Sequence, residues 1–453
     1  MGKTKTKDPY EMTALQAVGW SGRGASLAVN VVILGYLTFF CTNMLGMSAT
    51  TVGTLLLASK LFDGVTDLIA GMIIDKTNTR LGKARPYEFS ILAVWICTIL
   101  LYACPDLGMT GKCIWVFVMY AFVNSVFATL LNSSESVYLC RAFRYEEDRV
   151  KVASINGIVI MLCCTIVGVV FPILMGTLGT VKAGWIPMVA IIAVPFMLIG
   201  ILRFFLVKET VVVDKEKAPQ LKAVDFVDGL KSNIYIYILF GAAVLTFIAS
   251  NIGTAVGSYY FTYIVGDIGK LSVIGLLSLA TPIAIILMPV IMKKVSIPNL
   301  MAIASLLGAA GCLVKGFAGA NMTLQVIGNL MVVISVLPMS YYGPLLVIHI
   351  MDYHEYKTGK RVEAVFGSIY GLATKIGSGL ASGLVGVIMG ATGFDGLAAT
   401  QTDSALSAIV GLYGWIPGIM LLITAVLMFF FNLEKKLPEV HAELESRKTN
   451  AEQ

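Results

Sequence analysis

The chain has 453 residues, of which 57% are hydrophobic and 13% are charged. A soluble globular domain carries about 25% charged residues, so this composition excludes that class and indicates a membrane protein with many spans. The net charge of +6 gives no reason to expect a nucleic-acid partner, because the basic residues follow the predicted membrane topology.

Apolar runs of the roughly 20 residues that a helix needs to cross a bilayer recur along the chain. They predict an all-α polytopic protein with twelve transmembrane helices, at residues 17–41, 48–74, 86–105, 113–137, 153–176, 184–207, 233–264, 271–292, 298–318, 323–350, 363–391 and 405–432. The spans divide six and six. We expect a cytoplasmic segment (1–16), a bundle (17–207), a central cytoplasmic loop (208–232), a second bundle (233–432) and a cytoplasmic tail (433–453).

Lysine and arginine are distributed unevenly over the connecting loops. The loops after even-numbered spans hold most of them, whereas the loops after odd-numbered spans hold only Lys112, Lys182 and Lys270. Basic residues accumulate on the cytoplasmic side of short loops. We therefore expect a multi-pass protein of the cell membrane with both termini in the cytoplasm.

The predicted second span carries two carboxylates in its middle. Asp63 and Asp67 are four residues apart, so a helix presents both from one face, where they can share one ligand. Ionised acids at membrane depth are costly and persist where they pair with a cation or line a polar cavity. The spacing therefore predicts a cation site. A purely structural ion pair with Lys60 or Lys375 is the alternative.

Two loop motifs accompany this pair of acids. Residues 75–86 read DKTNTRLGKARP, and residues 351–363 read MDYHEYKTGKRVE. With the Asp63 and Asp67 pair, these motifs resemble those of the glycoside-pentoside-hexuronide:cation symporter family, and the resemblance extends from about residue 17 to 432. It implies the major facilitator fold, with two six-helix bundles around a central site, and symport driven by Na⁺, H⁺ or Li⁺.

The resemblance also assigns the cation site by position. The family's ligands fall on Asp63, Thr66, Asp67 and Thr129, and its site lysine falls on Lys375, which would supply the counter-charge. Hard cations prefer oxygen ligands, and Asp63 and Asp67 would serve as metal ligands if the ion is Na⁺. Burial beside a second acid also readily raises a carboxyl pKa, so H⁺ coupling stays open. Apart from the coupling ion, we expect no cofactor.

The family's sugar site is less complete in this chain. Galactoside-transporting relatives carry acids in the first and fourth spans and an arginine in the fifth, where this chain has Leu27, Asn132 with Ser136, and Gly157. The solute is therefore not expected to resemble melibiose, and a less polar solute is an alternative. The candidate solute-binding residues, each with a packing or interfacial role as the alternative, are Lys375, Asn132, Arg23, Tyr259, Tyr341 and Asn251.

Charged residues near the cytoplasmic loops are expected to form an inner gate, as the resemblance implies. Salt bridges of this kind stabilise the outward-facing state and must break when the carrier opens inward. The predicted gate residues are Arg80, Lys83, Arg85, Arg141, Arg149, Asp352, Glu355 and Arg361.

The sequence holds no nucleotide-binding glycine-rich loop and no nucleophile motif. We therefore predict that the protein is not an enzyme and that an ion gradient drives it. The predicted function is secondary active symport of a sugar or glycoside with Na⁺ or H⁺, by alternating access across the lipid bilayer. A carrier of the same fold for a non-carbohydrate solute and a membrane sensor that binds ligand without transport are the alternatives.

Overall fold

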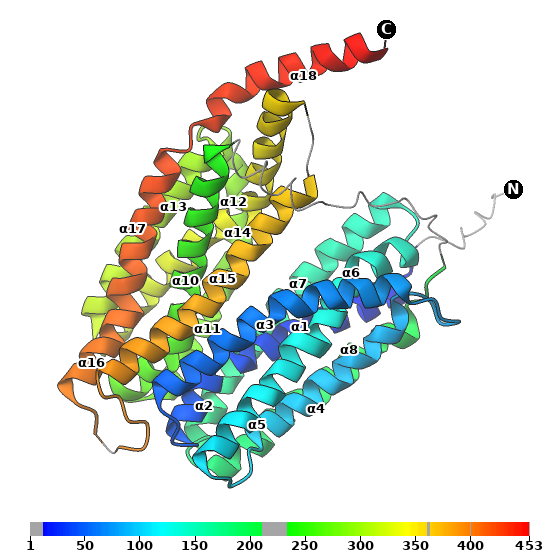
Figure 1. Ribbon diagram of the computed structural model, residues 1–453. Helices are drawn as coiled ribbons and strands as arrows, with labels where there is room; N and C mark the ends of the chain where they lie inside the picture. The colour runs from blue at the N-terminus through cyan, green and yellow to red at the C-terminus, as the bar shows by residue number, and fades with distance from the viewer. Residues whose placement is uncertain (1–11, 211–232, 360–362, 399, 453) are drawn as a thin grey trace, which may run out of the picture. The chain divides into compact units, whose positions relative to one another are not determined.

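The computed structural model describes residues 12–210, 233–359, 363–398 and 400–452, and these residues fold into helices joined by short loops (Figure 1). In the N-terminal part, the helices are α1 (Ala14–Leu34), α2 (Leu37–Asn43), α3 (Ala49–Lys76), η1 (Arg85–Phe89), α4 (Ser90–Tyr102), α5 (Met109–Ala121), the π-helical η2 (Phe122–Ala128), α6 (Thr129–Ala142), α7 (Glu146–Thr177) and α8 (Lys182–Leu206).

In the C-terminal part, the long helices are α10 (Ile234–Tyr263), α12 (Ala280–Met292), α13 (Ile297–Ala318), α14 (Met322–Thr358), α15 (Glu363–Ala391), α17 (Ile416–Phe429) and α18 (Leu437–Glu452). Shorter helical segments lie between them: η3 (Ile268–Lys270), α11 (Leu271–Gly275), η4 (Leu276–Leu279), α16 (Asp403–Val410), η5 (Gly411–Trp415) and η6 (Leu433–Lys436).

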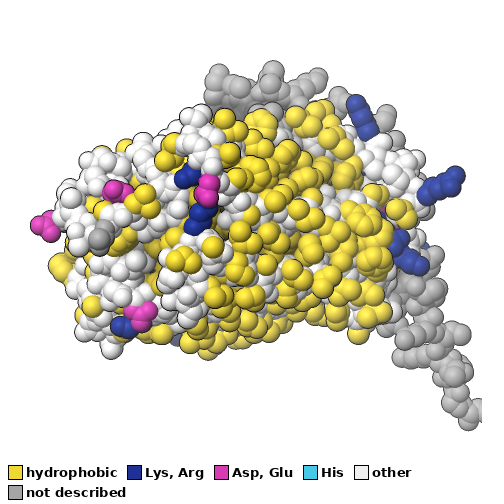
Figure 2. Space-filling model, turned by 90° about the horizontal axis from the view of Figure 1, so that it is seen from below, with side chains coloured by type: hydrophobic (Ala, Val, Ile, Leu, Met, Phe, Trp, Pro, Cys, Tyr) yellow, Lys and Arg dark blue, Asp and Glu magenta, His cyan; other side chains and the backbone are white. Residues whose placement is uncertain are grey.

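Among the described residues, 11 helical stretches are long and apolar enough to cross a membrane. They coincide with the predicted spans except the second, which corresponds to α3. That helix has 28 residues, sufficient to cross a bilayer, but it carries Lys60, Asp63 and Asp67 in its middle. Figure 2 shows hydrophobic side chains over most of one face of the molecule, with few charged side chains among them. An apolar surface of this extent is typical of contact with lipid, so the predicted fold class is confirmed.

The chain forms two compact units, each described here by itself. One unit comprises the described residues within Met1–Glu216, Asp267–Leu276 and Asp395–Ala399. The other comprises the described residues within Lys217–Gly266, Leu277–Phe394 and Thr400–Gln453. The first unit therefore contains α1 to α8. The central loop predicted at 208–232 falls almost entirely outside the described residues, so its role as a linker stays a prediction.

In the first unit, aromatic side chains join the ends of helices that are distant in sequence. Trp20 of α1 packs against Tyr138 of α6 at 5.5 Å between ring centroids and edge-on against Phe143 at 5.4 Å. At Thr13, a capping box with Gln16 satisfies backbone N–H groups at the start of α1. The start of α1 is thus fixed against α6, the helix that carries part of the site described below.

In the second unit, the core lies where α10, α14, α15 and α17 meet. Tyr235 packs edge-on against Tyr353 at 5.6 Å and Phe431 at 5.3 Å, and Phe366 of α15 is fully buried in the same cluster. The long α14 is capped at its N-terminus by Asn321, whose side chain accepts hydrogen bonds from the backbone N–H groups of Thr323 and Leu324.

Candidate functional site

The two carboxylates of α3 lie against η2 and the first turn of α6. The Ser125 hydroxyl donates a hydrogen bond to Asp63 Oδ1. The Thr129 hydroxyl lies 3.3 Å from Asp67 Oδ1 and also 3.0 Å from the carbonyl oxygen of Asn124. Because α3 presents residues i and i+4 on one side, both acids reach the same neighbouring segment. The structure thus brings Asp63, Asp67 and Thr129 together. Spacing predicted that the two acids share one face, Thr129 was assigned by the family resemblance, and cation binding stays a prediction.

A lysine is the nearest cation to the first of these acids. Lys60 lies one turn before Asp63 on α3, and its Nζ is 3.3 Å from Asp63 Oδ2. The Asp63 side chain is buried, and the Lys60 ammonium also lies 5.7 Å from the ring centroid of Tyr120. The ion pair with Lys60 is therefore present, so a bound cation would share the Asp63 carboxylate with this lysine or displace it.

The hydroxyl of Thr66 bonds to its own helix. Its Oγ1 lies 3.1 Å from the carbonyl oxygen of Asp63 and 3.4 Å from that of Phe62. This back-bonding uses the hydroxyl hydrogen and leaves the oxygen lone pairs as the part able to meet a cation. The assignment of Thr66 as a ligand stays a prediction.

Sequence reasoning missed Ser125, although it stands four residues before the predicted Thr129. The π-helical turn at Phe122–Ala128 changes the helical register locally. The hydroxyl that meets Asp63 therefore lies inside this turn, where the resemblance to the family had placed no ligand. The sequence did offer a signal for Ser125: it stands four residues before Thr129, just as Asp63 stands four residues before Asp67.

A second group of ionisable side chains, mostly buried, lies in the same unit, and sequence reasoning identified only Arg23 among them. We call this group the four-residue charge cluster: Arg23 of α1, Glu88 of η1, Glu135 of α6 and Arg203 of α8. Glu88 Oε2 lies 3.7 Å from Arg23 Nε, and Glu88 Oε1 lies 3.7 Å from Arg203 Nε. Both arginines also pair with Glu135 Oε2, at 2.8 Å for Arg203 Nη1.

The cluster balances two positive and two negative formal charges. Arg23, Glu88 and Arg203 are at most 3% exposed, whereas the Glu135 side chain is 36% exposed. The Arg203 guanidinium also stacks on Trp20, with 3.2 Å between Cζ and the ring centroid. Ionisable residues inside predicted spans are functional candidates by default, and this rule was the signal that could have revealed the other three members.

The predicted solute-binding residues of the first unit differ in accessibility. Asn132 is exposed on α6. Arg23 is buried, and its guanidinium meets Glu88, Glu135 and the carbonyl oxygen of Leu131. The solute-binding role predicted for these two residues is not tested by these contacts.

The predicted solute-binding residues of the second unit lie on α10, α14 and α15. Tyr259 is fully buried, and Asn251 donates to the carbonyl oxygen of Phe247 at 2.7 Å. Tyr341 is 54% exposed. Lys375 lies on α15, and its carbonyl oxygen accepts a hydrogen bond from Ser378. Asp63 and Lys375 belong to different units, so the counter-charge role of Lys375 stays a prediction.

Several predicted gate residues of the first unit surround a carboxylate that sequence reasoning missed. Glu209 accepts hydrogen bonds from the backbone N–H groups of Lys83, Ala84 and Arg85 at 2.7–2.9 Å. Its Oε2 is also 3.8 Å from Arg141 Nη1. Glu209 thus fastens the loop after α3 to the residues that follow α8.

The remaining gate predictions have separate partners. Arg149 Nε donates to the carbonyl oxygen of Phe143 at 2.9 Å, and Arg80 is exposed. In the second unit, Asp352 Oδ2 lies 3.3 Å from His441 Nε2, and the carbonyl oxygen of Glu355 accepts the N–H of Gly359. Arg361 lies outside the described residues. The gate itself stays a prediction.

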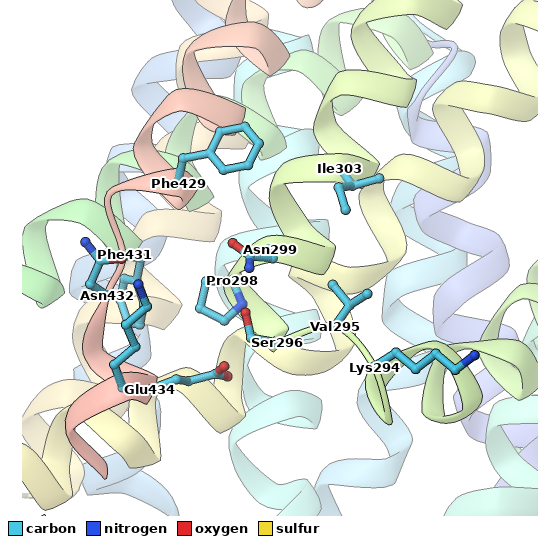
Figure 3. Close-up of a pocket in the computed structure, with 11 residues that line it drawn as sticks. Lys294, Val295, Ser296, Pro298, Asn299, Ile303, Phe429, Phe431, Asn432 and Glu434 are labelled. Carbon is cyan, nitrogen blue, oxygen red and sulfur yellow. The ribbon is translucent and has the colours of Figure 1, made fainter.

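A cavity of about 760 Å³ opens in the second unit between the start of α13 and the end of α17 (Figure 3). Its lining includes Lys294, Ser296, Asn299, Asn432 and Glu434. The Glu434 carboxylate accepts the N–H of Ile297 at 3.2 Å, which fixes one wall of the cavity. The predicted cation and solute residues are not among those that line it.

The comparisons with known proteins place this helical membrane fold among transporters rather than enzymes. The family model described as "MFS/sugar transport protein" matches residues 20–435. The chain therefore belongs to this family of the major facilitator superfamily, as the loop motifs predicted.

Two relatives extend over nearly the whole chain. The isoprimeverose transporter of Lactiplantibacillus pentosus is 28% identical, covering 91% of this chain and 87% of its own. The uncharacterized symporter YnaJ of Bacillus subtilis is 27% identical, covering 96% of each chain. Among solved structures, a bacterial homologue of the lysosomal transporter Spinster, inward-facing and unoccupied, superposes with a TM-score of 0.66 at 14% identity. It covers 95% of this chain and 99% of that one, and it shows the fold alone.

Proposed function

We propose that the protein is a cation-coupled symporter of a sugar or glycoside that works by alternating access. The single observation that carries the proposal is the pairing of Asp63 with Ser125 and of Asp67 with Thr129 inside a membrane span. The names of the relatives, an isoprimeverose transporter and a symporter, support the sugar class and the coupling.

The charge balance at this site favours a monovalent ion. Asp63 and Asp67 carry two negative charges, and the Lys60 ammonium beside Asp63 offsets one of them. One Na⁺ or one proton would bring the group to neutrality, which is the favourable state where water is scarce. The carboxylate and hydroxyl oxygens are also the donor type that Na⁺ prefers.

Coupling follows if the loaded and unloaded sites favour different conformations. A ligand shifts a conformational equilibrium only by its difference in affinity for the two states. In this proposal the ion neutralises the remaining negative charge of the Asp63 and Asp67 site, and the sugar binds beside it. The doubly loaded carrier then reorients, and both termini stay on the cytoplasmic side. When the carrier reorients, the contacts that Glu209 makes to the loop after α3 must either break or move together as one rigid piece.

Uptake by proteoliposomes tests this proposal. Purified protein is reconstituted, and an inward Na⁺ or H⁺ gradient is imposed with labelled isoprimeverose, xylose, methyl glucoside or methyl glucuronide outside. We expect one gradient to drive accumulation of at least one sugar. Asp63→Asn and Asp67→Asn should abolish that accumulation, whereas Asp106→Asn, the same change in an exposed loop, should leave it intact.

Three results would contradict the proposal. Full gradient-driven uptake in both span variants would refute the cation site. Uptake of apolar solutes instead of sugars would favour a carrier for a non-carbohydrate solute. Binding without any transport would favour a sensor.

A further inference from the structure

Glu135 differs from the other members of the four-residue charge cluster in its exposure. Its side chain is 36% exposed, while Glu88 and Arg203 are 0% exposed and Arg23 is 3% exposed. Both carboxylates touch the same two arginines. Compensation of the two arginines accounts for the presence of both acids, but it does not require the second acid to reach the surface of the unit.

Glu135 has one accessible polar neighbour on its own face of α6. Asn132 stands three residues earlier and is exposed. Residues three and four apart are neighbours on a helix surface. Thr129, which meets Asp67, precedes Glu135 by six residues, or about 9 Å along the helix axis at 1.5 Å per residue. At 3.6 residues per turn, six residues also put the two side chains on different sides of α6, so the carboxylate is separate from the candidate cation site.

The two arginines hold the carboxylate in one orientation. Between described residues, the ion pairs of Glu135 are made by Oε2, with Arg23 Nη2 and Arg203 Nη1, so the lone pairs of Oε1 can accept a further donor. Charge-assisted hydrogen bonds to a fixed carboxylate are stronger than neutral ones and discriminate by geometry. Sugar hydroxyls are donors of the required kind.

We propose that Glu135 is a solute-binding residue that accepts hydrogen bonds from the hydroxyls of a neutral sugar. This inference rests on the proposed function and names its substrate class. Glu135 would replace the acid that galactoside carriers place where this chain has Asn132, one turn away. The accessible member of the cluster is a carboxylate and both cations are buried, so the site accepts hydrogen bonds from hydroxyl groups and offers no donor to a sugar's own carboxylate.

Two matched substitutions separate solute contact from charge compensation. Glu135→Asp and Glu88→Asp both keep the charge, both shorten the side chain by one methylene, and both leave the arginines in place. The dissociation constant is measured on purified protein, with saturating coupling ion, for the neutral sugar of the uptake panel that binds most tightly. Losing a charge-assisted hydrogen bond should raise that constant about tenfold or more in Glu135→Asp. Glu88→Asp should stay within about twofold of the parent protein, since the hydrogen bonds to the solute are unchanged.

Stabilisation by the coupling ion alone gives a second measurement. Glu135→Asp should retain the parent protein's response to the ion, because Asp63 and Asp67 are unchanged. Unaltered sugar affinity in Glu135→Asp, or equal losses in both aspartate variants, would overturn the inference while leaving the proposed function in place. Preference for methyl glucuronide over every neutral sugar would overturn the substrate class. A parent protein that binds no sugar of the panel would overturn both the proposed function and the inference.

Discussion

Removing the buried charge of Glu88 should destabilise the first unit strongly. Glu88 is 0% exposed and lies 3.7 Å from both Arg23 Nε and Arg203 Nε. At an effective dielectric constant of about 20, each contact at that distance contributes roughly 4 kcal/mol of attraction before desolvation is counted. In Glu88→Gln, two buried arginines share one carboxylate. Breaking a buried ion pair by removing one partner costs about 3–5 kcal/mol, and we expect a loss of that size.

Thermal unfolding in detergent, followed by tryptophan fluorescence, measures this loss. Trp20, one of five tryptophans in the chain, stacks directly on Arg203, so part of the measured emission reports on the cluster. The matched control is the double variant Glu88→Gln with Arg203→Gln, which restores a net charge of zero. We expect the double variant to unfold at a higher temperature than Glu88→Gln alone. Equal stability of Glu88→Gln and the parent protein, or simple addition of the two losses, would refute this account of the cluster.

Three further variants test separate parts of the structure. Ser125→Ala removes the hydroxyl that meets Asp63, so the ion concentration for half-maximal thermal stabilisation should rise about tenfold; an unchanged value would exclude Ser125 from the site. Asp106→Asn should not change the unfolding temperature at neutral pH, because Asp106 is fully exposed. The Lys182 ammonium lowers the pKa of Asp106, so any stabilisation by this pair is present above the usual aspartate pKa and is lost as the pH falls below it. Lys315→Met removes a buried ammonium that lies 3.9 Å from the ring centroid of Tyr413. Among the described residues, no carboxylate forms an ion pair with it. The variant should unfold at or above the parent temperature, and a fall of several degrees would contradict this.

The fold was predictable because the bilayer imposes a simple requirement on sequence. Each crossing helix needs about 20 apolar residues, and on this basis the predicted spans other than the second agree with the 11 observed helical stretches among the described residues. The proximity of Asp63, Asp67 and Thr129 was also predictable, since helical periodicity paired the two acids and the family resemblance pointed to Thr129.

The remaining site residues depend on tertiary packing. Ser125 reaches Asp63 from a π-helical turn, and a regular α-helical register does not predict that geometry. Glu88, Glu135 and Arg203 come from three different segments, and only their packing reveals a shared cluster with Arg23. Helical periodicity relates residues within one helix, so it carries no information about such contacts.

Linkage between the ion and the sugar tests the central claim most directly. The dissociation constant of the best-binding sugar is measured with Na⁺ or K⁺ at two pH values, for the parent protein and for Asp63→Asn. In a symporter, the coupling ion should tighten sugar binding by about tenfold, and the sugar must tighten ion binding by the same factor. We expect Asp63→Asn to lose this dependence. Equal sugar affinity under all four conditions in the parent protein would contradict cation coupling at this site.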